Sequence, residues 1–144
     1  MKWTIDHSRL PVFIRVDVDG TASSEDNIAL WSALLSLNEW QPGTSVLIDN
    51  RKLEPPRIGS SQMMMDLTQF FIQRKEKIGP ACIAIIRTSS EGYAYSRQFE
   101  YGLRLRGSEV IVRNFGDEKE AVAWLSDCSD QDHNVEFATE IKSS

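Results

Sequence analysis

The 144-residue chain contains only two cysteines, two histidines and no long hydrophobic run. Its longest uninterrupted apolar segment, residues 81–86, is far too short to span a bilayer, which requires about 20 apolar residues. The N-terminal sequence MKWTIDHSRL lacks the apolar core of a signal peptide. We therefore expect a cytoplasmic protein without a transmembrane segment, in which both cysteines, Cys82 and Cys128, are reduced.

Recognisable catalytic and metal-binding motifs are also absent. His7 and His133 lie in polar terminal segments, and the cysteines have no metal-ligand or redox spacing. We therefore expect no metal, no cofactor and no enzymatic activity. The strongest argument for an enzyme is that Asp17, Asp19 and Asp49 could converge at strand ends and hold a divalent cation, but such acids more often form turns and helix caps.

The sequence contains no recognisable nucleic-acid-binding module, and its charge is not predominantly basic. The net charge is −5, and the excess of acid lies in residues 117–144, which hold eight acids and two bases. Arginines make the region from residue 87 to residue 113 locally basic, but the protein as a whole is acidic. We therefore do not expect it to bind DNA or RNA.

The chain does contain an alternation of short apolar runs and amphipathic segments. The expected elements are strands at 2–6 and 11–18, a helix at about 24–37, a strand at 44–49, a helix from 60 or 61, a strand at 81–86, a helix at 93–105, a strand at 109–115 and a helix from 117. This ββαβαβαβα order predicts an α/β domain with a mostly parallel sheet of about five strands, an N-terminal antiparallel hairpin and about four flanking helices. The continuous apolar run 81–86 is typical of a central strand.

Turn and cap residues mark several boundaries of these elements. The turn at residues 20–21 is expected to end the hairpin, and Ser23 with Asp26 forms a capping box for the first helix. Two prolines exclude a helix from the loop 52–59, after which Ser60 or Ser61 is expected to cap the next helix.

The last residues differ in composition from the rest of the chain. We assign residues 1–127 to the α/β domain and residues 128–144 to an acidic tail. Four tail residues alternate as in a short extra strand: Val135, Phe137, Thr139 and Ile141.

The helix after residue 60 carries an apolar stripe formed by Met64, Leu67 and Phe71 and widened by Met63 and Phe70. The simplest interpretation is that these side chains fill the core. The alternative is a dry pocket beneath this helix, lined by the two methionines and the two phenylalanines, which would suit a small-molecule or lipid carrier.

A candidate recognition surface follows the strand at 44–49. Asp49 and Arg51 lie where ligands of open α/β sheets bind, although an internal ion pair explains the same residues. Ser60 and Ser61 are expected beside them, where free backbone N–H groups at the helix start would attract an anion or an acidic residue of a partner.

Arg97 is a further candidate anion-binding residue. It lies near the start of the expected helix 93–105, together with Tyr93 and Tyr95. Stacking of the guanidinium on a tyrosine ring explains this arrangement equally well.

Several segments together resemble the SpoIIAA-like, or STAS-like, family. They are the hairpin, the turn at 20–21, WQPGTSVLIDNR, the segment Tyr93–Glu100 and VIVRNFGDEKEAVAWL, and they cover about residues 2–127. The resemblance implies an α/β domain related to anti-sigma-factor antagonists, with a distant likeness to lipid-transfer domains. In such antagonists a serine at the start of the helix after the central strand is phosphorylated, and Ser60 and Ser61 occupy the comparable place. The usual Asp-Ser pair is absent here, and Gly59 precedes the two serines.

These observations rank three functional classes. A non-enzymatic regulatory or protein-interaction module with an unidentified protein partner is first. A carrier of an anionic or lipid-like small ligand is second, and an enzyme is last. The sequence leaves the oligomeric state open, with a homodimer among the alternatives.

Overall fold

The computed structural model describes residues 1–56 and 59–128. Five strands form one sheet, and their order in the sheet is their order in the chain. The strands are β1 (Lys2–Asp6), β2 (Ile14–Thr21), β3 (Val46–Glu54), β4 (Cys82–Ile86) and β5 (Ile111–Phe115). β1 and β2 are antiparallel, and the other neighbouring pairs are parallel. The predicted α/β class, with an N-terminal hairpin on a mostly parallel sheet, is therefore confirmed.

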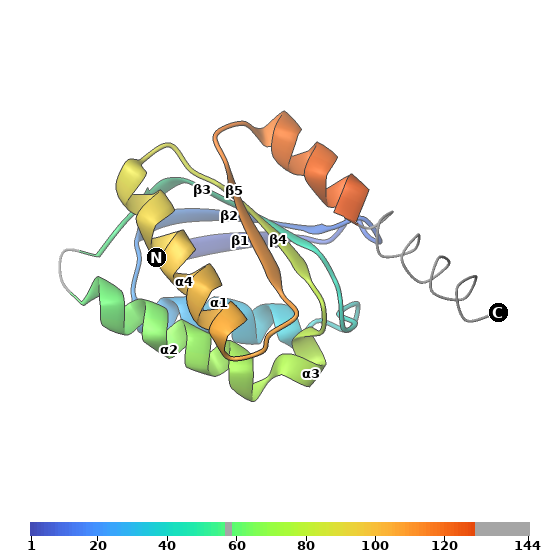
Figure 1. Cartoon of the computed structure of the whole chain (residues 1–144). Coiled ribbons are helices and arrows are strands. Elements are labelled where there is room, and N and C mark those ends of the chain that lie inside the picture. The colour runs from blue at the N-terminus through green and yellow to red at the C-terminus, as the bar shows by residue number, and fades with distance from the viewer. Residues whose placement is uncertain (57–58, 129–144) are drawn as a thin grey trace.

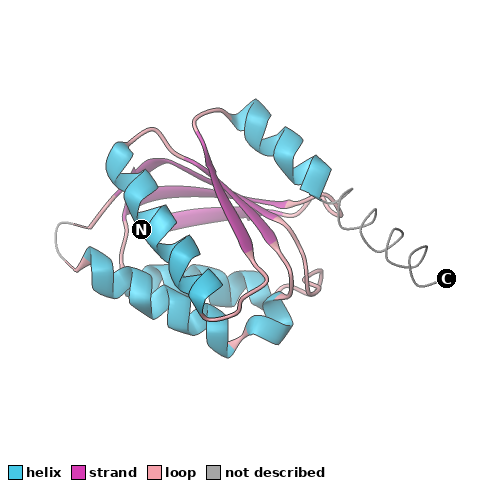
Figure 2. Cartoon of the chain, in the orientation of Figure 1, coloured by secondary structure: helices cyan, strands magenta, loops and turns pink. Residues whose placement is uncertain are grey.

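Helices cover both faces of the sheet, as Figures 1 and 2 show. One face packs against α1 (Ser24–Leu35), α2 (Ser60–Gln73) and α4 (Ser90–Leu105), and the other against a last helix at residues 118–128. A short helix, α3 (Lys75–Ile78), follows α2. The sequence analysis did not separate it from α2, which explains why the structure has one helix more than expected.

The alternation of side chains along the strands divides the core into two parts. Toward the three long helices, Val16, Ile48 and Ile83 pack together with Trp31 and Phe71. The smaller part on the other face contains Leu47, Cys82, Ala84, Ile86, Ala121 and Leu125. All five residues of β4 are buried, which confirms the prediction of a strand covered on both faces. The strand is not the central one, because it lies between β3 and the edge strand β5.

The two predicted helix caps have different outcomes. The hydroxyl of Ser23 accepts a hydrogen bond from the backbone N–H of Asp26 at 3.1 Å, so the predicted cap of α1 is confirmed. The prediction that Ser60 or Ser61 caps α2 is wrong, because Gly59 occupies the cap position and makes no side-chain hydrogen bond there. Its φ of 76° is a left-handed conformation that glycine adopts without steric cost, and the serines therefore fall in the first turn.

β2 and β3 run further than the sequence predicts. After a register shift between Asp17 and Asp19, Gly20 still pairs with Leu53, so the predicted break of β2 at this glycine is wrong. A bulge of this kind keeps two strands paired after a local irregularity. β3 consequently extends to Glu54, and the loop that follows it is shorter than predicted.

Cys82 and Cys128 form a disulfide, with their Cα atoms 6.7 Å apart. The prediction that both cysteines are reduced is therefore wrong. It rested on local spacing, whereas the fold places a residue of β4 beside the last helix. Disulfides are rare in cytosolic proteins, so this bond does not support the cytoplasmic location, which stays a prediction.

The predictions about the tail and about a transmembrane segment can be compared only with the described part of the chain. The predicted tail strand at residues 135–141 lies outside the described residues, and so does nearly all of the proposed tail. None of the helices in the described part of the chain is long and apolar enough to cross a bilayer.

Candidate functional site

β3 and β4 separate at the carboxyl edge of the sheet. They pair from Val46 and Ile83 to Asp49 and Ile86, and beyond this point β3 pairs only with β2. β4 ends here, and the chain continues through Arg87 into α4. In open parallel sheets, crevices that bind ligands lie outside the carboxyl ends of the strands, so this is the place where a site is expected.

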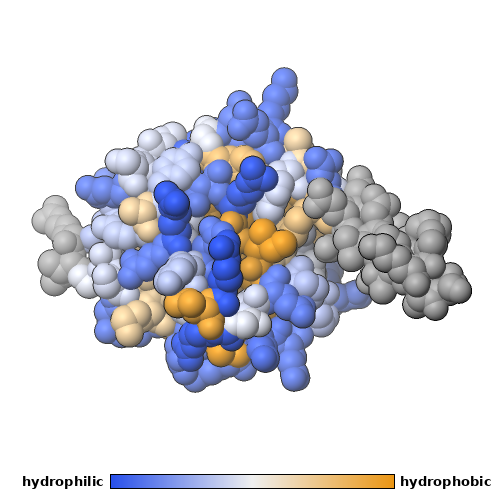
Figure 3. Space-filling model, in the orientation of Figure 1, coloured by the Kyte–Doolittle hydropathy of each residue, from blue (hydrophilic) through white to orange (hydrophobic). Residues whose placement is uncertain are grey.

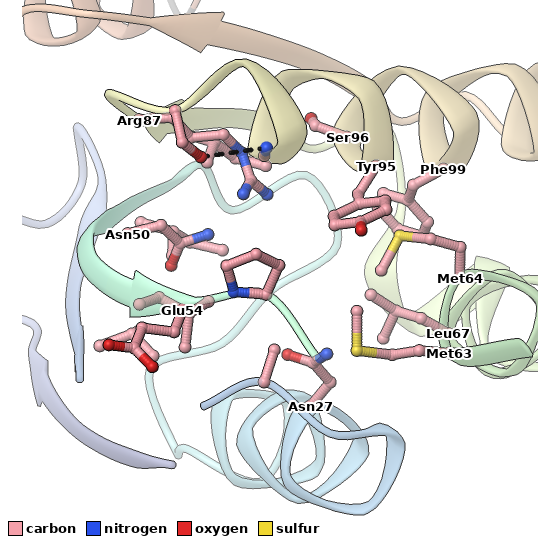
Figure 4. A pocket seen from close by; sticks show the side chains of 18 of the residues that line it. Asn27, Asn50, Glu54, Met63, Met64, Leu67, Arg87, Tyr95, Ser96 and Phe99 are labelled. Atoms are coloured by element: carbon pink, nitrogen blue, oxygen red, sulfur yellow. Dashed lines mark hydrogen bonds between the residues drawn. The ribbon is translucent and has the colours of Figure 1, made fainter. Parts of the chain in front are cut away.

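A pocket of about 290 Å³ occupies this place, between the sheet and α1, α2 and α4. Small-molecule sites have volumes of roughly 300–1,000 Å³, so the pocket is at the lower end of that range. Its walls are mainly apolar and include Trp31, Ile48, Met63, Met64, Leu67 and Phe99. Several of these side chains appear in Figure 4.

The predicted pocket beneath the second helix is only partly like the observed one. Met63 and Met64 line the cavity. Phe70 and Phe71 do not, because their side chains are buried in the packed core. The stripe on α2 thus serves both the core and the pocket wall.

Polar atoms in the pocket lack partners among the described residues. The Oδ1 atom of Asn50 and the Oγ atom of Ser96 are buried and make no hydrogen bond. Ser96 is only 2% exposed. A buried polar atom without a partner costs about 1–3 kcal/mol of stability. These two atoms have almost no accessible surface, so it is other atoms of Asn50 and Ser96 that face the open pocket.

Arg87 and Arg51 are the only cations among the described residues that line the pocket. Its Nε donates a hydrogen bond to Oδ1 of Asn114 at 3.2 Å, and its backbone N–H donates to the carbonyl of Phe115 at 2.9 Å. Burial of the guanidinium lowers the pKa of Arg87 to about 10, which leaves the side chain charged at neutral pH. No carboxylate in the described ranges forms an ion pair with it.

Gly92 allows the Arg87 guanidinium to lie against the first turn of α4. A Cβ atom at this glycine would be 2.8 Å from Nη1 of Arg87, closer than real Cβ contacts. The hydroxyl of Ser89 caps the same turn by accepting the Gly92 N–H at 3.1 Å, the dashed line in Figure 4. The figure shows the guanidinium beside this turn and pointing into the cavity, with Asn50 on the strand across from it.

Asp49 and Arg51 form an ion pair on the opposite face of the sheet. Nη2 of Arg51 lies 2.7 Å from Oδ2 of Asp49, and Arg15 contacts the same oxygen at 3.3 Å. Hydrogen bonds from Arg51 lower the pKa of Asp49 below its ordinary value. Arg15 also pairs with Asp17 and with Glu118 of the last helix, so the charges form one network. The internal ion pair that the sequence left open is therefore present.

The structure does not bring the other predicted site residues to this network. Ser60 and Ser61 lie in the first turn of α2, which packs on the other face of the sheet from the ion pair. Arg97 is exposed on α4 and does not line the pocket, whereas Tyr95 does. The roles proposed for these serines and for Arg97 stay predictions.

A metal site built from the aspartates has no support in the geometry. Asp17 and Asp49 both contact Arg15 rather than an open space between carboxylates. Within residues 1–56 and 59–128, no three His, Cys, Asp or Glu side chains are grouped so that they could hold a metal ion.

The sequence analysis did not single out Asn50, Arg87 and Ser96, which are among the polar residues that line the pocket. One signal was available for Arg87, because it directly follows the most apolar strand of the chain. A charged residue at the carboxyl end of a central strand lies where ligands bind. Nothing in the sequence distinguishes Ser96 from an ordinary exposed helix serine.

Comparisons with known proteins support the fold. Neither a family model nor a curated protein matches this chain. One similar solved structure is the crystal structure of an uncharacterised DUF3478-family protein with a SpoIIAA-like fold from Shewanella loihica PV-4. The two structures have a TM-score of 0.56 and 16% sequence identity, and the match covers 86% of this chain and 92% of the other. Identity this low relates the folds alone. The resemblance noted in the sequence is confirmed at that level: the chain has a SpoIIAA-like fold.

Proposed function

We propose that this protein is a non-enzymatic domain that binds a small molecule in the pocket between β3 and α4. The observation that carries the proposal is a mainly apolar cavity that contains the charged side chain of Arg87, which forms no ion pair with a carboxylate of the described residues. Apolar walls with a few convergent polar groups are the usual composition of ligand sites.

The described residues that line the pocket offer little for catalysis. There is no histidine, cysteine or lysine among them, and Glu54 is their only carboxylate. Hydroxyl groups such as those of Ser89 and Tyr95 are present, but Glu54 makes no side-chain hydrogen bond to any of them, so no nucleophile is coupled to a base. This composition supports binding rather than a reaction.

A regulatory or protein-interaction module remains the second candidate. The SpoIIAA-like fold favours it, and so does the partial exposure of the ion network, in which Arg51 is 43% and Glu118 is 46% exposed. It ranks lower because the charges of Asp49 and Arg51 are already paired with each other. On the side of the molecule in Figure 3, hydrophobic side chains form small areas between hydrophilic ones.

Blocking the pocket should abolish binding of a neutral apolar dye. Met63 and Met65 provide a matched pair, because Met63 lines the pocket and is 4% exposed, whereas Met65 is 61% exposed. We expect the fluorescence of N-phenyl-1-naphthylamine to increase with wild type and with Met65→Trp. Met63→Trp should weaken the dye affinity by about tenfold or more, since an indole would fill the cavity.

Circular dichroism and urea unfolding must show that both variants are folded. Failure of wild type to bind the dye, or unchanged affinity in folded Met63→Trp, would argue against a ligand pocket. Native mass spectrometry of protein purified from its own host provides a second readout, because a retained ligand or protein partner would appear as added mass.

A further inference from the structure

We infer that Arg87 binds a negatively charged group of the ligand. The pocket would then accept a small amphiphile with one carboxylate or phosphate monoester on an apolar body. This inference rests on the proposed ligand-binding function and specifies the chemical class of the ligand.

The donors of Arg87 that remain free face the cavity. Nε is bound to Asn114, but Nη1 and Nη2 make no hydrogen bond to any described residue. A guanidinium presents its donors in a planar fork that matches the two oxygens of a carboxylate or phosphate. Glu54 is the only carboxylate among the described residues that line the pocket, and in Figure 4 it points away from Arg87 beyond Asn50. The described part of the chain thus places the fork in the pocket without supplying its counter-ion.

The start of α4 adds positive potential at the same place. Backbone N–H groups in the first turn of a helix carry partial positive charge, and the Arg87 guanidinium packs against this turn at Gly92. Two positive features lie side by side here, and an anion between them would stabilise both.

The rest of the pocket limits the size and polarity of the ligand. Met63, Leu67 and Phe99 form an apolar wall on the side of α2 and α4. A cavity of about 290 Å³ suits one short alkyl chain or a ring system rather than a lipid with two long chains. A ligand with an anionic head beside Arg87 and a single apolar body along this wall therefore fits the pocket.

Competition with the dye tests the inference. Octanoate, octyl phosphate and neutral 1-octanol share an alkyl chain and differ in the head group. We expect at least one anion to displace the dye from wild type about tenfold more effectively than 1-octanol. Whichever of octanoate and octyl phosphate displaces the dye more effectively identifies the head group, carboxylate or phosphate, that the pocket prefers. In Arg87→Gln this preference should disappear while the affinity for 1-octanol stays unchanged.

Two further variants separate the charge of Arg87 from its position. Arg104→Gln removes an exposed arginine of α4 that does not line the pocket, and it should keep the preference for anions. Gly92→Ala keeps every charge but places a Cβ 2.8 Å from the present position of Nη1, so it should weaken anion binding and leave 1-octanol unaffected. If Arg87→Gln does not fold, Gly92→Ala takes its place as the test of the anion site.

The outcomes distinguish this inference from the proposed function. Equal displacement by the anions and by 1-octanol in wild type would overturn the anion site but leave the ligand pocket in place. A preference that survives in folded Arg87→Gln, or in Gly92→Ala if that is the variant that folds, would likewise overturn it. Absence of dye binding to wild type, with no displacement to measure, would overturn both.

Discussion

Asn50 and Arg51 show how adjacent residues of one strand acquire different roles. Successive side chains of a strand point to opposite faces of the sheet. The Asn50 side chain therefore faces the helices and the pocket, whereas that of Arg51 joins Asp49 and the network near the last helix. Asn50 thus contributes to the pocket, whereas Arg51, although it also lines the pocket, has its charge paired within the ion network.

Arg51→Ala should destabilise the protein by no more than about 1 kcal/mol at about pH 7, because the pair with Asp49 is partly exposed. Since Arg51 lowers the pKa of Asp49, the stabilisation is present above the ordinary value of 3.8 and is lost as the pH falls through the lowered value. The effect of the substitution should therefore shrink at about pH 2. Urea midpoints at both pH values measure it.

Lys52→Ala is the control for this prediction, since Lys52 is exposed and forms no ion pair with another described residue. It should leave both midpoints unchanged. If Arg51→Ala instead kept full stability but lost a partner captured by wild type, Arg51 would be a recognition residue, as the alternative interpretation of the sequence holds.

At this scale the sequence allowed only part of the site to be predicted. The pairing of Asp49 with Arg51 could be foreseen as one of two alternatives, because both residues lie on the same face of one strand. The pocket residues could not, since Asn50 and Ser96 come from a strand and a helix that meet only in the folded protein. Whether a polar atom lacks a partner depends on these tertiary contacts.

At the scale of elements, α2 connects the core with the pocket. The ring of Phe71 makes edge-to-face contacts with Trp31 of α1 at 4.7 Å and with Phe99 of α4 at 5.0 Å between ring centroids. These contacts hold the three helices together on one face of the sheet. Phe99 also lines the pocket, so aromatic packing positions part of its wall.

Phe71→Ala should reduce the free energy of unfolding by about 3–5 kcal/mol, because the ring is only 1% exposed and its removal leaves a cavity. The urea midpoint measures this loss. Tyr101→Ala is a suitable control, since its ring is 63% exposed and little change is expected. A near-zero effect of Phe71→Ala would mean that this stripe of α2 is not part of the core.

The elements themselves were largely predictable, and their ends were not. Apolar periodicity follows burial, so the position of β4 and the buried stripe of α2 could be inferred directly. The start of α2 depends on the left-handed conformation of Gly59, and the length of β2 depends on a register shift. Both are set by local backbone geometry that a hydrophobic pattern does not report.

At the scale of the whole molecule, a disulfide cross-links the smaller of the two core parts, which contains both cysteines. The disulfide links β4, which lies between β3 and β5 in the sheet, with the last helix, and its cysteines are 46 positions apart in the sequence. This separation explains why residue spacing did not reveal the pairing. The larger core part contains no disulfide cysteine and should hold its packing without the bond.

Cys128→Ala should lower the free energy of unfolding by about 2–4 kcal/mol and leave the circular dichroism spectrum native. Wild type in reductant should have the same urea midpoint as this variant. Adding a chelator should cause no further change, since we expect no metal. Loss of the native spectrum in reductant would show that the core alone does not maintain the fold, and an unchanged midpoint would show that the bond does not form.

The bond between Cys82 and Cys128 also closes a covalent ring with the intervening backbone. This ring contains Arg87, all of α4 and β5. One protease cut inside it, for example at the exposed turn around Gly107, opens the ring without releasing a fragment. The cleaved protein would migrate as one band on a non-reducing gel and as two bands after reduction. The segment that carries Arg87 would thus stay tethered to the last helix even after its backbone had been cut.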